Sequence, residues 1–73
     1  MARLTNGARL LRLWRTERDM TQAQLAELLQ VSYEQVSRAE TGYHLPSLLL
    51  AVRISRVTGG RVPEESWAQE DAA

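Results

Sequence analysis

The chain has 73 residues, of which 44% are hydrophobic, and its nine arginines are balanced by nine acidic residues. A chain of this length forms one domain with a small core, which is expected to be marginally stable unless a partner contributes to it. The absence of cysteine excludes disulfides and thiolate metal sites.

The charges are unevenly distributed along the chain, although they sum to zero. Residues 1–62 carry all nine arginines against five acids, whereas residues 63–73 carry four acids and no basic residue. Zero net charge argues against nucleic-acid binding, because neutralisation of phosphates supplies most of the non-specific affinity. The surplus of arginine over acidic residues in residues 1–62 weakens that argument, because the acidic residues that balance it lie in the C-terminal segment. The alternative is ordinary solvated charge with a solubilising tail, which predicts no partner.

No segment has the character of a membrane anchor or a signal peptide. The longest apolar run, LLLAV at 48–52, is far too short to cross a bilayer. The N-terminal sequence MARLTNGARLL has neither a long apolar region nor a small-residue cleavage site. We therefore expect a cytoplasmic protein without a membrane partner.

Breaker residues divide the chain into five segments, none with the alternation of a strand and most with helical spacing. The sequence thus predicts an all-α, compact five-helix domain over residues 1–69, followed by a frayed acidic tail over 70–73. In the first segment, about 6–18, Leu11 and Trp14 are spaced as core residues. The breakers are Thr21, Ser32, Gly42, Pro46, the pair Gly59-Gly60 and Pro63.

Two helix starts follow each other closely in the middle of the chain. Thr21 and Gln24 form a T-x-x-Q capping box, and Ser32 and Gln35 form an S-x-x-Q box. Caps this close leave room for only about two turns of helix and a tight corner. The spacing predicts two short helices packed around a turn.

The third segment is expected to show a polar face to solvent. On helical wheels, the apolar residues of the second and third segments point inward, so the remaining side chains of the third must face outward. The outward residues are Tyr33, Glu34, Ser37 and Arg38. The inward residues are Leu25, Ala26, Leu29, Val31, Val36 and Ala39.

The fourth segment, about 47–58, is apolar over well over half of its circumference, with only Arg53 and Arg56 marking a polar side. We expect this helix to be buried on several sides. A short fifth segment over 63–69 begins with Pro63, which suits a first helical turn.

The ordered motifs resemble the lambda-repressor-like (Cro/CI-type) helix-turn-helix DNA-binding domains over about residues 8–60. The resemblance is carried by R…TQxxLA…VSxxxVSRxExG…P within LLRLWRTERDMTQAQLAELLQVSYEQVSRAETGYHLPS. It implies a helix-turn-helix formed by the second and third helices. The third helix would be a recognition helix in the major groove of double-stranded DNA, with the second crossing above it.

The resemblance also implies contacts for individual residues. Base readout is assigned to Tyr33, Glu34, Ser37 and Arg38, with Arg38 able to pair with guanine O6 and N7. Arg38 is alternatively an i,i+4 partner of Glu34, which is compatible with base contact. Phosphate contact is assigned to Gln22, at the positive end of its helix, and to the further residues Thr21, Gln35, Tyr43 and His44.

A structural ion pair between Arg15 and Glu40 is implied as well, fixing the recognition helix to the first helix. The chain departs from the family pattern at Asp19 and Gln30, where relatives have glycine and the backbone turns left-handed. Gln30 in that conformation is expected to cost about 1 kcal/mol. The loop TGYHLP is also less basic than in relatives, which lowers the expected phosphate affinity.

Apolar surface beyond the helix-turn-helix predicts a homodimer. Leu49 is expected at the surface between two arginines, and Val62 and Trp67 lie in a segment too short to bury them alone. The predicted interface is Leu49, Arg53, Val62 and Trp67. Trp67, like Trp14, is expected to pack in a core rather than to stack on a ligand.

Three functions remain open on this reading. The first is a transcriptional repressor of a phage or mobile element that binds a palindromic operator. The second is an antitoxin or accessory regulator with a protein partner, and the third is a protein-interaction module that has lost DNA binding. An enzyme is not expected, because no nucleophile, base and orienting group fall together by spacing. His44 has no cysteine or second histidine with which to bind a metal, and no cofactor is expected.

Overall fold

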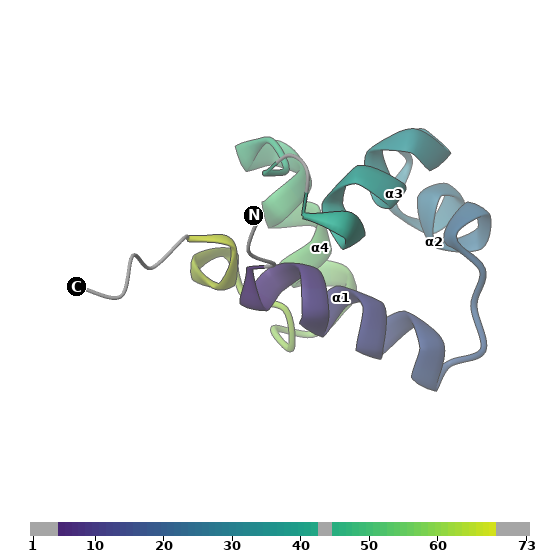
Figure 1. The fold of residues 1–73 in the computed structure, drawn as a ribbon, viewed down its shortest axis with the longest axis horizontal. Helices are drawn as coiled ribbons and strands as arrows, with labels where there is room; N and C mark the ends of the chain where they lie inside the picture. The colour runs from purple at the N-terminus through teal and green to yellow at the C-terminus, as the bar shows by residue number, and fades with distance from the viewer. Residues whose placement is uncertain (1–4, 43–44, 69–73) are drawn as a thin grey trace.

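The structure is a computed structural model that describes residues 5–42 and 45–68. Within these ranges the chain is all-α, as the sequence predicts, and forms four α-helices and one short 3-10 helix (Figure 1). They are α1 (Asn6–Glu17), α2 (Gln22–Leu29), α3 (Tyr33–Thr41), α4 (Leu48–Val57) and η1 (Glu64–Trp67).

The predicted fifth helix is only partly formed, because Glu64–Trp67 is a single turn of 3-10 helix and not an α-helix. The bonds around it span three residues: the Ser66 N–H donates to the Pro63 carbonyl at 3.0 Å, and the Ala68 N–H donates to the Glu65 carbonyl at 3.1 Å. A segment of four residues is too short to build a run of the i to i+4 bonds that stabilise an α-helix.

Each α-helix begins at a threonine or serine whose side chain accepts a hydrogen bond from a backbone N–H of the first turn. The four caps are Thr5, Thr21, Ser32 and Ser47. The structure confirms both predicted capping boxes, since Gln24 and Gln35 also accept from the backbone of their cap residues. Such a cap stabilises a helix by about 1 kcal/mol, which matters in helices of only eight to twelve residues.

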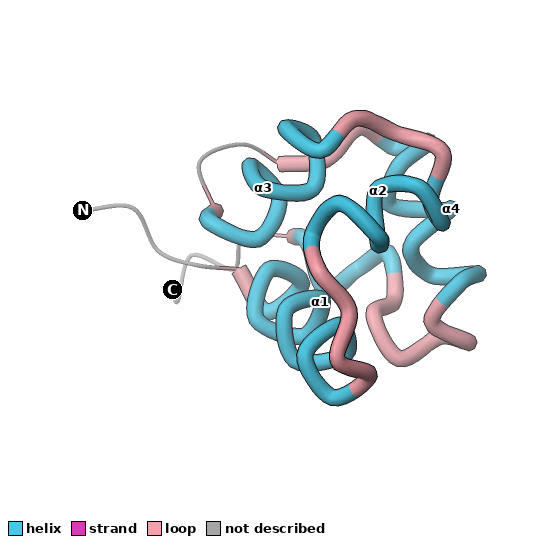
Figure 2. The backbone as a smooth tube through the Cα atoms, turned by 90° about the vertical axis from the view of Figure 1, so that its right-hand side faces the viewer, coloured by secondary structure: helices cyan, strands magenta, loops and turns pink. Residues whose placement is uncertain are grey.

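The helices enclose one core. In Figure 2, α2 lies between α3 and α4, and α1 is seen nearly end-on below them; Figure 1 shows α1 from the side, along the lower part of the group. The end of the described chain returns to α1, because η1 contacts both α1 and α4. The largest fully buried side chains are Leu11, Leu25, Leu29, Val36, Ile54 and Val62.

Trp67 closes this core against the start of α1. Its indole ring covers Gly7, where an added Cβ would lie 2.6 Å from ring atom Cε3. Trp67 is 5% exposed and Val62 is fully buried within the single chain. The fold of a single chain accounts for the burial of these two residues, and their place in a dimer interface stays a prediction.

Gly7→Ala is expected to destabilise the domain by about 1–3 kcal/mol, because the new methyl group overlaps a buried ring in a close-packed core. The higher helix propensity of alanine offsets only part of this loss. Urea unfolding followed by tryptophan fluorescence measures it. Asn6→Ala, one residue earlier and exposed, is the matched control and should change stability little. Equal stability of Gly7→Ala and wild type would contradict the close packing of Trp67.

Helix α4 is less enclosed than its composition predicts. Leu50, Ala51 and Ile54 are buried, but Leu48 and Leu49 at its start are 77% and 60% exposed. Leu45, just before the helix, is 57% exposed. We call Leu45, Leu48 and Leu49 the leucine patch.

Candidate nucleic-acid interface

The corner between α2 and α3 has the backbone shape expected from the sequence. Gln30 ends α2 in the left-handed conformation, with φ of 61°, and Asp19 before α2 has φ of 54°. The N–H of Val31 closes the corner by donating to the Ala26 carbonyl at 3.0 Å. The short loop therefore turns α3 across α2, although Gln30 lacks the conformational freedom of glycine.

An arginine from α4 supports this corner. The Nη1 atom of Arg53 donates to the carbonyl oxygens of Leu29 and Gln30, both at 3.3 Å. These carbonyls lie at the C-terminal end of α2, where the helix dipole favours a positive charge. The guanidinium group of Arg53 thus contacts the helix-turn-helix of its own chain, and its predicted place in a dimer interface stays a prediction.

Arg53→Ala should lower the free energy of unfolding by about 1 kcal/mol, because two carbonyl groups lose a charged donor. Arg56→Ala removes an exposed arginine from the same helix and provides the control, with little expected change. Thermal unfolding by circular dichroism measures both. A larger loss for Arg56→Ala than for Arg53→Ala would contradict the role given to Arg53.

Helix α3 directs polar side chains outward, as predicted. Tyr33 is 54% exposed, Glu34 and Arg38 are exposed, and Ser37 is half-buried. No salt bridge joins Glu34 to Arg38 in the part of the chain that the structure describes, so the proposed i,i+4 pair is not formed there. Glu34 lies in the first turn of α3, where the helix dipole stabilises a negative charge.

The predicted phosphate ligands Thr21 and Gln35 both take part in helix caps. The Oγ1 atom of Thr21 accepts from the Gln24 N–H at 3.0 Å, and Oε1 of Gln35 accepts from the Ser32 N–H at 3.0 Å. A hydroxyl that accepts such a bond still has its own proton to donate. Of the other three predicted ligands, Tyr43 and His44 lie outside the described residues, and Gln22 is the first residue of α2.

The Arg15 and Glu40 side chains form the ion pair that the resemblance implies. Arg15 Nε donates to Glu40 Oε2 at 2.7 Å, and Arg15 Nη2 donates to Glu40 Oε1 at 2.9 Å. The side chains are only 13% and 2% exposed, respectively. The hydrogen bonds to Glu40 raise the pKa of Arg15, burial opposes this effect, and the negative charge of Glu40 reinforces it.

Two further contacts extend this pair to α2 and its preceding loop. The Nη1 atom of Arg15 donates to the Met20 carbonyl at 2.8 Å, and Nε2 of Gln22 donates to Glu40 Oε1 at 3.0 Å. The Gln22 contact was not predicted, because nothing in the sequence indicates a bond across eighteen positions. Gln22 as a whole is half-buried, and its amide nitrogen is bonded to Glu40.

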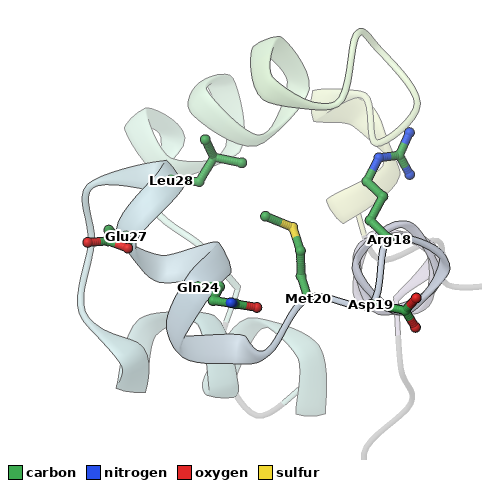
Figure 3. Close-up of a pocket in the computed structure, with 6 residues that line it drawn as sticks. All are labelled: Arg18, Asp19, Met20, Gln24, Glu27 and Leu28. Carbon is green, nitrogen blue, oxygen red and sulfur yellow. The ribbon is translucent and has the colours of Figure 1, made fainter.

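A shallow hollow lies beside α2 and its preceding loop. Met20 projects toward Leu28 inside it, with Asp19 and Glu27 at its two sides (Figure 3).

The described residues hold no group of three metal-binding side chains. Within the same residues, no helix is long and apolar enough to span a membrane.

The fold and the exposed face of α3 together define a helix-turn-helix domain. The sequence profile of the helix-turn-helix family HTH_3, of Cro/C1 type, matches residues 11–64, which is well over half of the chain. The chain belongs to this non-enzymatic family, and membership implies DNA binding and a role in transcriptional regulation. No curated protein and no solved structure matched the chain.

Proposed function

We propose that the protein is a sequence-specific repressor that binds a palindromic operator as a homodimer, in the cytoplasm of a host carrying a phage or mobile element. The observation that carries this proposal is the exposed polar face of α3, held on a capped and supported corner. In a helix-turn-helix, the second helix enters the major groove and its exposed side chains meet base edges.

Within this proposal, Arg38 makes the main base contact. It is exposed on the outward face, and its guanidinium group can donate two hydrogen bonds to one guanine. Tyr33, Glu34 and Ser37 are the remaining candidates for base readout. Glu34 is the weakest of them for affinity, because a carboxylate beside DNA is repelled by phosphates, although it can accept a bond from cytosine N4.

Gln22 and Thr21 serve in the proposal as phosphate contacts. They stand at the start of α2, where the helix dipole and the backbone N–H groups of the first turn favour an anion. Contacts of this kind fix the position of the protein on DNA and carry no sequence information.

The leucine patch is the proposed contact between two copies of the chain. Its three leucines are close together in the sequence and make up half of the six large hydrophobic side chains that are exposed in the described part of the chain. A second copy is the favoured occupant, because one recognition helix reads one half-site and a palindrome requires a two-fold pair. The half-sites should then lie about 10 bp apart, centre to centre.

Leu49→Lys is expected to shift the protein toward monomer, because the substitution places a charge in an apolar contact. Sedimentation equilibrium at micromolar concentration measures the change. Leu28→Lys replaces another exposed leucine, on α2, and should leave self-association unchanged. Wild-type protein that remains monomeric with and without DNA would contradict the proposed dimer.

Selection of bound sequences from random duplex DNA, at a stated salt concentration, tests the proposed function. The expected result is an enriched motif with two-fold symmetry. Failure to enrich any motif would contradict sequence-specific binding and favour a protein-interaction module. An enriched motif together with a monomeric protein would favour an antitoxin or accessory regulator whose leucine patch binds a different protein.

A further inference from the structure

Glu40 joins three helices at one carboxylate. It lies on the inner side of α3, and both of its oxygens accept hydrogen bonds from Arg15 of α1. The oxygen Oε1 also accepts from Nε2 of Gln22, the first residue of α2. The buried end of the recognition helix is thereby bonded to a side chain at the proposed phosphate site.

We propose that Glu40 is a positioning residue for DNA binding: it holds the Gln22 amide in the orientation that presents an N–H donor to a DNA phosphate. This inference rests on the proposed function of the surface. It assigns Glu40 a part in binding beyond its ion pair with Arg15.

The chemistry of the amide favours this role. A glutamine side chain ends in one acceptor oxygen and one nitrogen with two hydrogens, and it can present either end. Glu40 has only acceptors to offer, so it selects the orientation in which the nitrogen faces it. One hydrogen of that nitrogen is donated to Glu40, and the second remains for another acceptor such as a phosphate oxygen. A single amide nitrogen can therefore bridge Glu40 and DNA.

Arg15 makes such a bridge electrostatically acceptable. Without it, Gln22 would bring a phosphate close to a carboxylate whose side chain is only 2% exposed, where solvent screens repulsion poorly. The paired hydrogen bonds from Arg15 neutralise that carboxylate in place. Arg15 thus supports the same contact without reaching the DNA.

Holding Gln22 before DNA arrives should also strengthen binding. A mobile glutamine must be ordered when it binds, and immobilising such a side chain at an interface lowers affinity by about twofold to tenfold. The bond to Glu40 means that the folded protein has met this requirement in advance.

A double-mutant cycle on binding to random duplex DNA tests the proposal. Glu40→Gln keeps the size of the side chain but leaves one acceptor oxygen, for which Arg15 competes with Gln22. Gln22→Ala should weaken binding by about threefold to tenfold in the wild type and by less than about twofold in Glu40→Gln. If Gln22→Ala lowered the affinity for DNA by the same factor in the wild type and in Glu40→Gln, the proposal would be overturned.

Arg38→Ala provides the matched control in both backgrounds, measured on the selected operator. Its cost should be the same with Glu40 or with glutamine at position 40, which shows that α3 has not moved. If the cost of Arg38→Ala also falls in Glu40→Gln, the effect of Glu40 is on the whole helix, and the specific role for Gln22 is overturned. If the wild-type protein binds no duplex, both the proposed function and this inference are overturned. If it binds DNA but Gln22→Ala has the same effect in both backgrounds, only the inference is overturned.

The side-chain amide signals of Gln22 in the free wild-type protein give a second test that needs no substitution at Glu40. One Gln22 amide proton should be shifted downfield and exchange more slowly with water than the amide protons of Gln30, which is exposed. The same shifts and exchange rates for both glutamines would overturn the proposal, even if Glu40→Gln fails to fold.

Discussion

Arg38→Ala is expected to weaken operator binding by about 1–3 kcal/mol per half-site and to relax the preference at one base pair in each half-site. Arg38 is exposed on the outward face of α3, and no salt bridge to Glu34 holds it within the described part of the chain. Its loss should therefore remove a base contact while leaving the fold unchanged. Fluorescence anisotropy on operator and random duplexes, with circular dichroism as a folding check, measures the effect.

Two further substitutions separate base readout from phosphate attraction. Arg38→Lys keeps the charge but cannot form the planar bidentate pair, so it should lose most of the same specificity. Gln22→Ala should weaken operator and random DNA alike, because phosphate contacts are not sequence-specific. If Arg38→Ala lowered both affinities equally and left the selected motif intact, Arg38 would be a phosphate contact. Base readout would then rest on Tyr33, Glu34 and Ser37.

The parts of the structure that follow from local sequence were predictable. Capping boxes involve residues only three positions apart, so Thr21 with Gln24 and Ser32 with Gln35 locate the starts of α2 and α3 directly. The left-handed corner at Gln30 was predicted from the tight spacing and the resemblance, despite the unfavourable residue type. The outward face of α3 followed from helical periodicity, because a regular helix fixes which side chains share a side.

Contacts between distant segments were not predictable in the same way. Composition indicated that Val62 and Trp67 were too apolar for a short exposed segment, but not that the segment would fold back over Gly7. The same holds for Arg53, whose charge marked a polar side of α4 without indicating that it would reach α2. Each of these contacts depends on how helices pack.

The proposed DNA contacts also divide into those that the sequence alone predicts and those that depend on helix packing. Arg38 can be assigned a role from residue type and periodicity, whereas the link from Gln22 to Glu40 depends on the crossing of α2 and α3. A residue pattern names the side chains at a surface, but the packing beneath it decides which of them are held in place before a ligand binds.

Arg15→Ala is expected to destabilise the domain by about 3–5 kcal/mol, because it leaves the Glu40 carboxylate buried and without its cation. The Met20 carbonyl loses its donor as well. Small domains have about 5–15 kcal/mol of total stability, so this single change removes a large part of it. Urea unfolding followed by tryptophan fluorescence measures the loss.

The double substitution Arg15→Met with Glu40→Leu separates two contributions to the free energy of unfolding. One is the penalty for leaving a single buried charge unpaired, and the other is the net stabilisation by the intact ion pair. Replacing both partners by apolar side chains removes the buried charge, so most of the stability lost in Arg15→Ala should return. The affinity for random duplex DNA should nevertheless stay about threefold to tenfold below that of the wild type, because Gln22 then has no carboxylate to hold its amide. A loss below about 1 kcal/mol in Arg15→Ala would mean that water reaches Glu40 and screens it. Recovery of both stability and DNA affinity in the double variant would mean that the ion pair serves the fold alone and that Gln22 binds phosphate without it.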